Sequence, residues 1–126
     1  MKLDHATVST PHLETMRDFF CNIVGLSIGP RPPFSFDGHW LYHEDKAVIH
    51  LIATQDEYPP ARQTSRIDHL AFRVGSDDDW SQLITRLQAA GITYRETALP
   101  DNSERQLFTS PVPGVKIEFV TTNRPS

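Results

Sequence analysis

An internal repeat is the feature of this sequence that most limits its fold. Residues 3–8 (LDHATV) resemble residues 67–72 (IDHLAF), and both segments place a histidine at the same position. Each segment is followed by a helical pattern that ends at a glycine. Later come residues 47–52 (AVIHLI) in the first half and 115–120 (VKIEFV) in the second. Because these features recur in the same order at a nearly constant spacing, the chain is predicted to be a duplication of one supersecondary unit.

Each repeat is predicted to contain one helix and four strands in the order β-α-β-β-β. The chain of 126 residues is expected to form one α+β domain over residues 1–126. It consists of a module 1–53, a polar, proline-bearing linker 54–65 and a module 66–122. The strands are expected at 2–8, 26–29, 37–43 and 47–53, and at 66–74, 92–96, 104–110 and 115–122.

The two helices have recognisable ends. The first is predicted to have Thr10 as its N-cap, with Pro11 at the first helical position. The second is predicted to begin after Ser76, to carry three aspartates in its first turn, and to end at a left-handed Gly91. The apolar stripes expected to face the sheets are Leu13, Met16, Phe20, Ile23 and Val24 in the first helix, and Trp80, Leu83, Ile84 and Leu87 in the second.

The composition excludes several classes of function. Twelve Lys+Arg against sixteen Asp+Glu give a net charge of −4, which lacks the basic surface of a nucleic-acid-binding protein. No apolar run approaches the roughly 20 residues of a membrane span, and the sequence shows no signal-peptide pattern. A single cysteine, Cys21, excludes an intramolecular disulfide. We therefore expect a cytoplasmic protein with neither nucleic-acid nor membrane partners.

Four ionisable residues occupy repeated positions: His5 and His69 in the first strand of each module, and His50 and Glu118 in the last. Burying an unpaired charge in an apolar strand is costly, so these side chains need partners. Equivalent residues of a duplication lie near a pseudo-twofold axis, which predicts that the four converge on a metal ion. Three imidazoles and one carboxylate suit Zn, Fe, Ni, Co or Mn, whereas Ca and Mg prefer more oxygen ligands. The subset His5, His69 and Glu118 is a two-His-one-carboxylate set that leaves positions open for substrate.

Two further histidines, His39 and His43, share a face of their predicted strand with Leu41. They either line a pocket or face water.

These residues resemble the vicinal oxygen chelate superfamily, which includes glyoxalase I, methylmalonyl-CoA epimerase, fosfomycin-resistance enzymes, extradiol dioxygenases and bleomycin-binding proteins. The resemblance covers essentially the whole chain and rests on residues 3–5, 19–26, 67–72 and 110–118. It implies a glyoxalase-like fold, in which paired modules form a cupped mixed sheet around a divalent metal. It also implies ligand positions at His5, His69 and Glu118. His50 falls on the fourth ligand position, where glyoxalase I often has glutamate and the epimerase has glutamine.

The first functional hypothesis is a metal-dependent lyase or isomerase of glyoxalase type. The metal chelates two neighbouring oxygens of a small substrate and stabilises an enediolate, while a base moves a proton between adjacent carbons. His50 or Glu118 is expected to be that base. The residues expected to contact the substrate are Arg31, Phe34, Phe36, Trp40, Arg105, Gln106 and Phe108.

Two alternatives stay open. An Fe(II) extradiol-type ring-cleaving dioxygenase has the same two-His-one-Glu set. However, the positions of its acid–base groups hold residues 46–48 (KAV) and Phe108 here. A non-catalytic binding protein of the bleomycin-resistance type usually lacks metal ligands, whereas this chain has four ligand-type residues. The resemblance also implies a homodimer, in which a second copy covers sheet edges and an apolar back.

Overall fold

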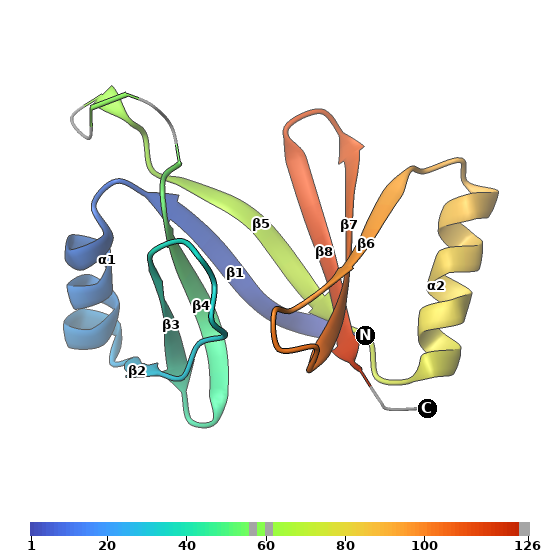
Figure 1. The fold of residues 1–126 in the computed structure, drawn as a ribbon, viewed down its shortest axis with the longest axis horizontal. Helices are drawn as coiled ribbons and strands as arrows, with labels where there is room; N and C mark the ends of the chain where they lie inside the picture. The colour runs from blue at the N-terminus through green and yellow to red at the C-terminus, as the bar shows by residue number, and fades with distance from the viewer. Residues whose placement is uncertain (56–57, 60–61, 124–126) are drawn as a thin grey trace. The chain divides into compact units, whose positions relative to one another are not determined.

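The structure is a computed structural model that describes residues 1–55, 58–59 and 62–123. Eight strands, two α-helices and a π-helical turn form within these residues (Figure 1). The elements are, in chain order, β1 (Lys2–Thr10), α1 (Leu13–Phe19), η1 (Phe20–Val24), β2 (Ser27–Gly29), β3 (Gly38–His43), β4 (Lys46–Ala53), β5 (Arg66–Arg73), α2 (Asp77–Ala89), β6 (Tyr94–Ala98), β7 (Glu104–Val112) and β8 (Val115–Thr122). None of the described helices has the length and hydrophobicity of a membrane span.

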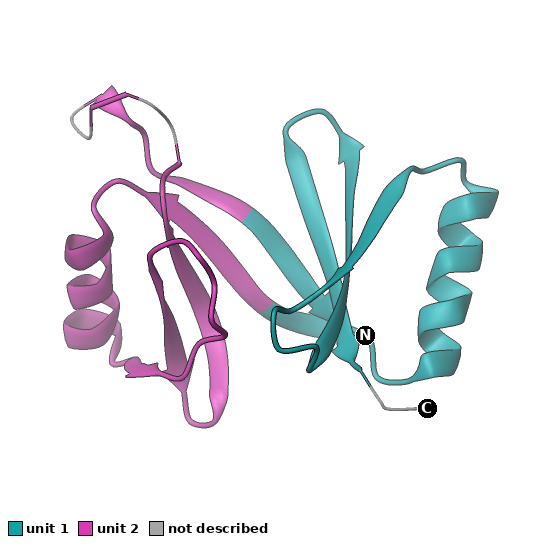
Figure 2. Cartoon of the chain, viewed as in Figure 1, with its two compact units in different colours: residues 1–4, 69–126 teal, residues 5–68 magenta. Residues whose placement is uncertain are grey.

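Tertiary contacts divide the chain into two compact units (Figure 2). Unit 2 contains residues 5–68, and unit 1 contains residues 1–4 and 69–126. The boundaries fall directly before His5 and His69, so β1 and β5 each contribute residues to both units. Residues 56–57 and 60–61 of the predicted linker, and residues 124–126 of the predicted domain, lie outside the described part of the chain.

Each unit has the predicted β-α-β-β-β order and contains a mixed four-stranded sheet. In unit 2 the strand order is β2-β3-β4-β1, with β1 parallel to β4 and the other neighbours antiparallel. In unit 1 the order is β5-β8-β7-β6, with β5 parallel to β8 and the other neighbours antiparallel. The expected α+β class and the strand–helix pattern are therefore observed.

The duplication extends to the register of the strands. His50 on β4 pairs with Trp40 on β3, and Glu118 on β8 pairs with Phe108 on β7. Because paired residues of neighbouring strands point to the same face of a sheet, each of these ionisable residues lies beside an aromatic one. The repeat therefore places equivalent pairs of residues at equivalent points of the two sheets.

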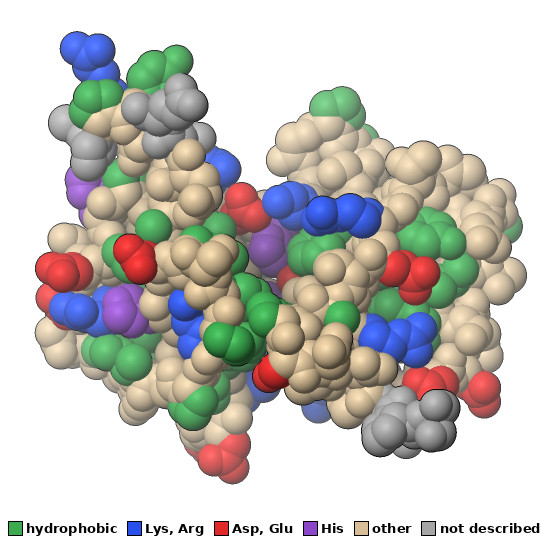
Figure 3. All heavy atoms as spheres, viewed as in Figure 1, with side chains coloured by type: hydrophobic (Ala, Val, Ile, Leu, Met, Phe, Trp, Pro, Cys, Tyr) green, Lys and Arg blue, Asp and Glu red, His purple; other side chains and the backbone are tan. Residues whose placement is uncertain are grey.

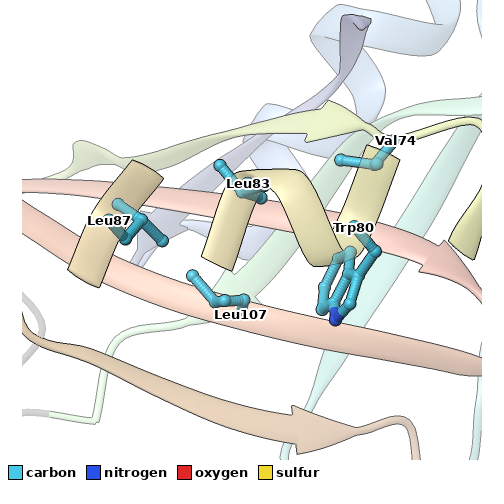
Figure 4. Close-up of a cluster of buried hydrophobic side chains, with 5 residues drawn as sticks. All are labelled: Val74, Trp80, Leu83, Leu87 and Leu107. Atoms are coloured by element: carbon cyan, nitrogen blue, oxygen red, sulfur yellow. The ribbon is translucent and has the colours of Figure 1, made fainter. Parts of the chain in front are cut away.

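The core of unit 1 lies between α2 and its sheet (Figure 4). Ser76 caps α2 as predicted, since its Oγ accepts a hydrogen bond from the N–H of Asp79 at 3.1 Å. Gly91 closes the helix with φ +68°, again as predicted. The cluster of buried side chains consists of Val74, Trp80, Leu83, Leu87 and Leu107.

The core of unit 2 confirms only part of the predicted apolar stripe. Leu13, Met16 and Phe20 pack against buried residues of β1, β3 and β4. Ile23 and Val24 are instead 73% and 54% exposed, so their predicted packing is wrong. The reason is that residues 20–24 form a π-turn, whose wider hydrogen-bond spacing rotates the following side chains away from the core.

The first helix also begins later than predicted. Its N-cap is His12, whereas Thr10 is the last residue of β1. The Oγ1 of Thr10 accepts a hydrogen bond from the N–H of His12 at 3.0 Å and lies 2.8 Å from the Oγ of Ser65. Thr10 therefore stabilises the turn between strand and helix instead of the helix end, and the predicted cap is wrong.

Candidate metal centre

Unit 1 brings together three of the predicted site residues. The Nε2 of His69 lies 2.9 Å from Oε1 of Glu118, and the side-chain amide of Gln106 donates to Oε2 of Glu118 at 3.2 Å. The register explains the first contact: Glu118 pairs with Ala71, two residues after His69 and on the same face of β5. Glu118 is only 2% exposed, so its carboxylate is buried and held by both neighbours.

Unit 2 brings together the equivalent residues in a different way. The rings of His5 and His50 stack with their centroids 3.6 Å apart and their planes 18° apart. Trp40 stacks on His50 with a centroid distance of 3.9 Å and an interplanar angle of 10°. Because β4 lies between β1 and β3, the His50 ring lies between the other two rings. His5 itself is 5% exposed.

An aromatic loop lies beside Trp40 in the same unit. The ring of Phe34 is 6.3 Å from that of Trp40 and 4.9 Å from that of Phe36. The guanidinium of Arg31 lies 5.0 Å from the ring centroid of Phe34 and from that of Phe36, and its Nη2 donates to the Phe36 carbonyl at 2.7 Å. Burial lowers the pKa of Arg31, although the charge of Asp37 opposes this. Arg31 therefore holds this loop in place through its contacts with Phe34 and Phe36. The predicted contact of Arg31 with a substrate stays a prediction.

The remaining substrate-binding candidates lie on β7 and divide between its two faces. Gln106 and Phe108 share a face with Glu118, and the ring of Phe108 meets that of His69 edge-on at 5.6 Å. Arg105 points the other way. Its guanidinium lies 5.1 Å from the ring centroid of Trp80, and its Nη1 lies 3.9 Å from Oδ1 of Asp77. The structure thus does not bring Arg105 together with the other candidates.

One residue near the site escaped the sequence analysis. Arg95 on β6 pairs with Phe108, and its guanidinium lies 5.4 Å from the centroid of that ring. The side of β7 that carries Phe108 therefore also carries an exposed cation. Arg95 is identified as a neighbour of Phe108 only by the register of the β6–β7 hairpin, and the sequence alone does not define that register.

The structure also shows where the two histidines of β3 lie, whose surroundings the sequence left open. His39 lies on the face of Leu41, which is buried in the core beneath α1, and so on the face opposite Trp40. The side chain of His43 is 71% exposed. Neither histidine joins the residues around His50.

The donors present fit a divalent transition metal. Two ligands bound to one ion at about 2.0–2.2 Å lie about 3 Å apart. This is the separation of His69 Nε2 and Glu118 Oε1, which are 2.9 Å apart. Imidazole nitrogen and carboxylate oxygen together favour Zn, Mn, Fe, Co or Ni over Ca and Mg. The contact of Gln106 with Glu118 supplies the kind of supporting hydrogen bond that orients a metal ligand.

Comparison with known proteins places the chain in a family. The model of the Glyoxalase/Bleomycin resistance protein/Dioxygenase superfamily matches residues 2–119. A search of curated proteins finds no match to the chain.

Solved structures share the fold at low sequence identity. Methylmalonyl-CoA epimerase from Mycobacterium tuberculosis is 22% identical with a TM-score of 0.73, over 98% of this chain and 89% of the epimerase. A 2,3-dioxygenase from Pseudomonas sp. KL28 is 20% identical with a TM-score of 0.78, over 98% of this chain and 41% of that one. The Mn(II)-bound glyoxalase from Novosphingobium aromaticivorans is 15% identical with a TM-score of 0.73, over 99% of this chain and 42% of that one. The chain thus spans less than half of the dioxygenase and of that glyoxalase.

Proposed function

Since the chain belongs to the Glyoxalase/Bleomycin resistance protein/Dioxygenase superfamily, we propose that it is a divalent-metal-dependent lyase or isomerase of glyoxalase type. Its substrate is a small molecule with two neighbouring oxygens. The observation that carries the proposal is the buried pair of His69 and Glu118, with donor atoms 2.9 Å apart.

The proposed ligands are His5, His69 and Glu118, each of which offers one donor atom. Two observations support the inclusion of His5. It is the repeat equivalent of His69, and it directly follows Asp4, whose Oδ1 accepts a hydrogen bond from Arg73 Nε at 2.7 Å within unit 1. His5 is therefore covalently tied to a residue that is anchored in the unit of His69 and Glu118.

A divalent metal held by His5, His69 and Glu118 would act as a Lewis acid and stabilise negative charge on the substrate oxygens. The protein must then supply a base that takes a proton from one carbon and returns it to the next. Glu118 is less suited to this role because His69 and Gln106 hold its two oxygens. His50 is the other candidate, either as a fourth ligand or as the base.

We propose that aromatic side chains form the wall of the substrate site. In unit 2 the ring of Phe34 contacts those of Trp40 and Phe36, so the three side chains form a continuous aromatic surface. In unit 1 the ring of Phe108 lies edge-on to His69. Arg95 is the cation best placed to bind an anionic end of a substrate, since it is exposed and lies over Phe108.

Elemental analysis of the purified protein tests the proposed function. About one Zn, Ni, Mn or Co per chain supports it and directs a screen of 2-oxoaldehyde adducts and acyl-CoA epimers. One Fe per chain that is lost in air favours an extradiol-type dioxygenase instead. If the protein contains no metal and takes none up on titration, it is a binding protein rather than an enzyme of this type.

We also propose that the protein is a homodimer. Unit 2 exposes several large apolar side chains on α1, η1 and β2, and Figure 3 shows apolar side chains at the surface among charged ones. Burial of such groups by a second copy is favourable. Light scattering coupled to size-exclusion chromatography checks the mass, and a monomer at micromolar concentration contradicts the proposal. The side chains concerned are Phe19, Ile23, Val24 and Ile28.

A further inference from the structure

We infer that Arg73 is a positioning residue of the proposed metal centre, and that it acts on His5 through a salt bridge to Asp4. This inference rests on the proposed function, because it takes His5 as one of the ligands. It gives a role to a cluster of charged side chains in unit 1, formed by Asp4, Arg73 and Glu104, that lies outside the proposed ligand set.

The three side chains of this cluster come from three strands. Arg73 ends β5, Asp4 lies in β1, and Glu104 begins β7. The Nε of Arg73 donates a hydrogen bond to Oδ1 of Asp4 at 2.7 Å, and its Nη2 donates one to Oε2 of Glu104. Because a guanidinium group is planar and rigid, contacts at two of its nitrogens fix the orientation of the whole group. Glu104 therefore keeps the Nε of Arg73 directed at Asp4.

The salt bridge between Arg73 and Asp4 is largely shielded from water. The side chain of Asp4 is only 5% exposed, and that of Arg73 is 25% exposed. A carboxylate buried to this extent needs a partner that compensates its charge, so Asp4 is held where Arg73 lies. Dissolved salt weakens a buried pair much less than an exposed one. The contact is therefore suited to hold β1 in place.

The salt bridge reaches His5 through the backbone of β1. Asp4 and His5 are consecutive residues of this strand, so their side chains point to opposite faces. Since Arg73 holds the side chain of Asp4 on one face, it restricts rotation of the strand about its axis and directs His5 to the other face. The boundary between the two units falls between these residues, which makes Asp4 the last residue of unit 1 before His5. Metal ligands commonly depend on supporting contacts of this kind.

The other repeat lacks an equivalent anchor from a second strand. Asp68 directly precedes His69, as Asp4 precedes His5, and Nη2 of Arg66 lies 3.5 Å from its Oδ1. Arg66 belongs to the same strand as Asp68, and its side chain is 52% exposed. An exposed pair within one strand contributes little and cannot tie that strand to a neighbour.

Zinc binding by the full chain tests the inference. Arg73→Met alone leaves the buried carboxylate of Asp4 without the charge of Arg73, and the variant then risks not folding. The double variant Asp4→Asn/Arg73→Met removes the carboxylate together with its partner, which costs less stability. We expect this variant, once circular dichroism shows that it is folded, to bind zinc about 10–100-fold more weakly than the wild type, the usual loss for a supporting residue.

Two further variants accompany the double variant. Arg73→Lys keeps the positive charge but not the planar group that contacts two carboxylates at once, so it is expected to fold and to bind zinc with intermediate affinity. Arg66→Met is the matched control, because it removes the exposed arginine beside the equivalent aspartate of the other repeat. Its zinc affinity is expected to equal that of the wild type.

Nuclear magnetic resonance of the histidine rings separates a positioning role from a merely structural one. In the wild type, zinc is expected to move the ring signals of both His5 and His69. In the double variant, zinc concentrations that still move the signals of His69 are expected to move those of His5 less. A structural role would change the response of both histidines together or of neither.

The possible failures are distinguishable. If the folded double variant and Arg73→Lys bind zinc as tightly as the wild type, and both histidines respond as before, Arg73 is only structural. The inference is then overturned while the metal site stands. If the wild type takes up no zinc, the proposed function fails and the inference falls with it.

Discussion

His69 and Glu118 form a buried pair in which Nε2 and Oε1 are 2.9 Å apart, with Glu118 only 2% exposed. Burial of a carboxylate costs free energy of folding unless a partner compensates its charge. The contact with the imidazole of His69 partly compensates the burial of the carboxylate. A cation bound by both side chains, as proposed above, would compensate its charge directly.

His69→Ala is expected to abolish metal binding, because it removes a proposed ligand and leaves Glu118 without its imidazole neighbour. We expect the affinity to fall by more than about 100-fold, beyond the loss typical of a supporting residue. Elemental analysis of the purified variant, with circular dichroism to check folding, measures this. His43→Ala is the control because the side chain of His43 is 71% exposed. Full metal occupancy in a folded His69→Ala protein contradicts the proposed ligand set.

Gly38→Ala is expected to destabilise unit 2. A Cβ at Gly38 would approach the backbone carbonyl oxygen of Leu51 closer than 3.0 Å and would lie 3.0 Å from Nη2 of Arg31. Such overpacking typically costs about 1–3 kcal/mol. Urea unfolding measures the free energy of unfolding.

Gly75→Ala is the matched control for Gly38→Ala, since nothing lies within 4 Å of a Cβ at Gly75. We expect its free energy of unfolding to be equal to or slightly above that of the wild type. Equal stability of the two variants would refute the crowding at Gly38.

Ser76→Ala is expected to lower the free energy of unfolding by about 1 kcal/mol, because it removes the acceptor for the N–H of Asp79 at the start of α2. Chemical denaturation again supplies the measurement. Ser81→Ala is the control within the same helix. Ser81 is exposed in the helix interior, where alanine is the better helix former, so that variant should lose no stability. A loss at Ser81 as large as that at Ser76 would argue against the cap.

His39 is expected to titrate below its ordinary pKa. Burial is the largest cause that lowers the pKa of His39, followed by the charges of Arg17 and Arg31. The unfolded chain therefore binds a proton at His39 more readily than the folded protein does. As pH falls below about 6.5, this difference reduces the free energy of unfolding, until the folded protein is protonated as well.

The titration curve of the His39 ring, followed by nuclear magnetic resonance, gives its midpoint directly. His39→Gln is expected to weaken the pH dependence of unfolding below about pH 6.5. His12→Gln is a control at a second histidine, which is exposed beside α1. A midpoint for His39 above its ordinary value of about 6.5 would contradict the expected direction.

Much of the fold follows from local patterns in the sequence. The repeat predicts two β-α-β-β-β units, and both are present with the expected order of elements. The cap at Ser76 and the left-handed Gly91 depend on short-range chemistry and are also found. The predicted packing of Ile23 and Val24 is not found. One π-turn changes the helical periodicity that had predicted both side chains on the buried face of the helix.

The sequence by itself determined which residues are the candidates for a metal site, since a duplicated pattern of His5, His50, His69 and Glu118 is visible without coordinates. Only the tertiary structure decided how those residues meet. Strand register and side-chain packing join His69 to Glu118 by a hydrogen bond and stack His50 between His5 and Trp40. The physical reason is that repetition fixes equivalent backbone positions, whereas ring orientation depends on neighbours from strands that are distant in the sequence.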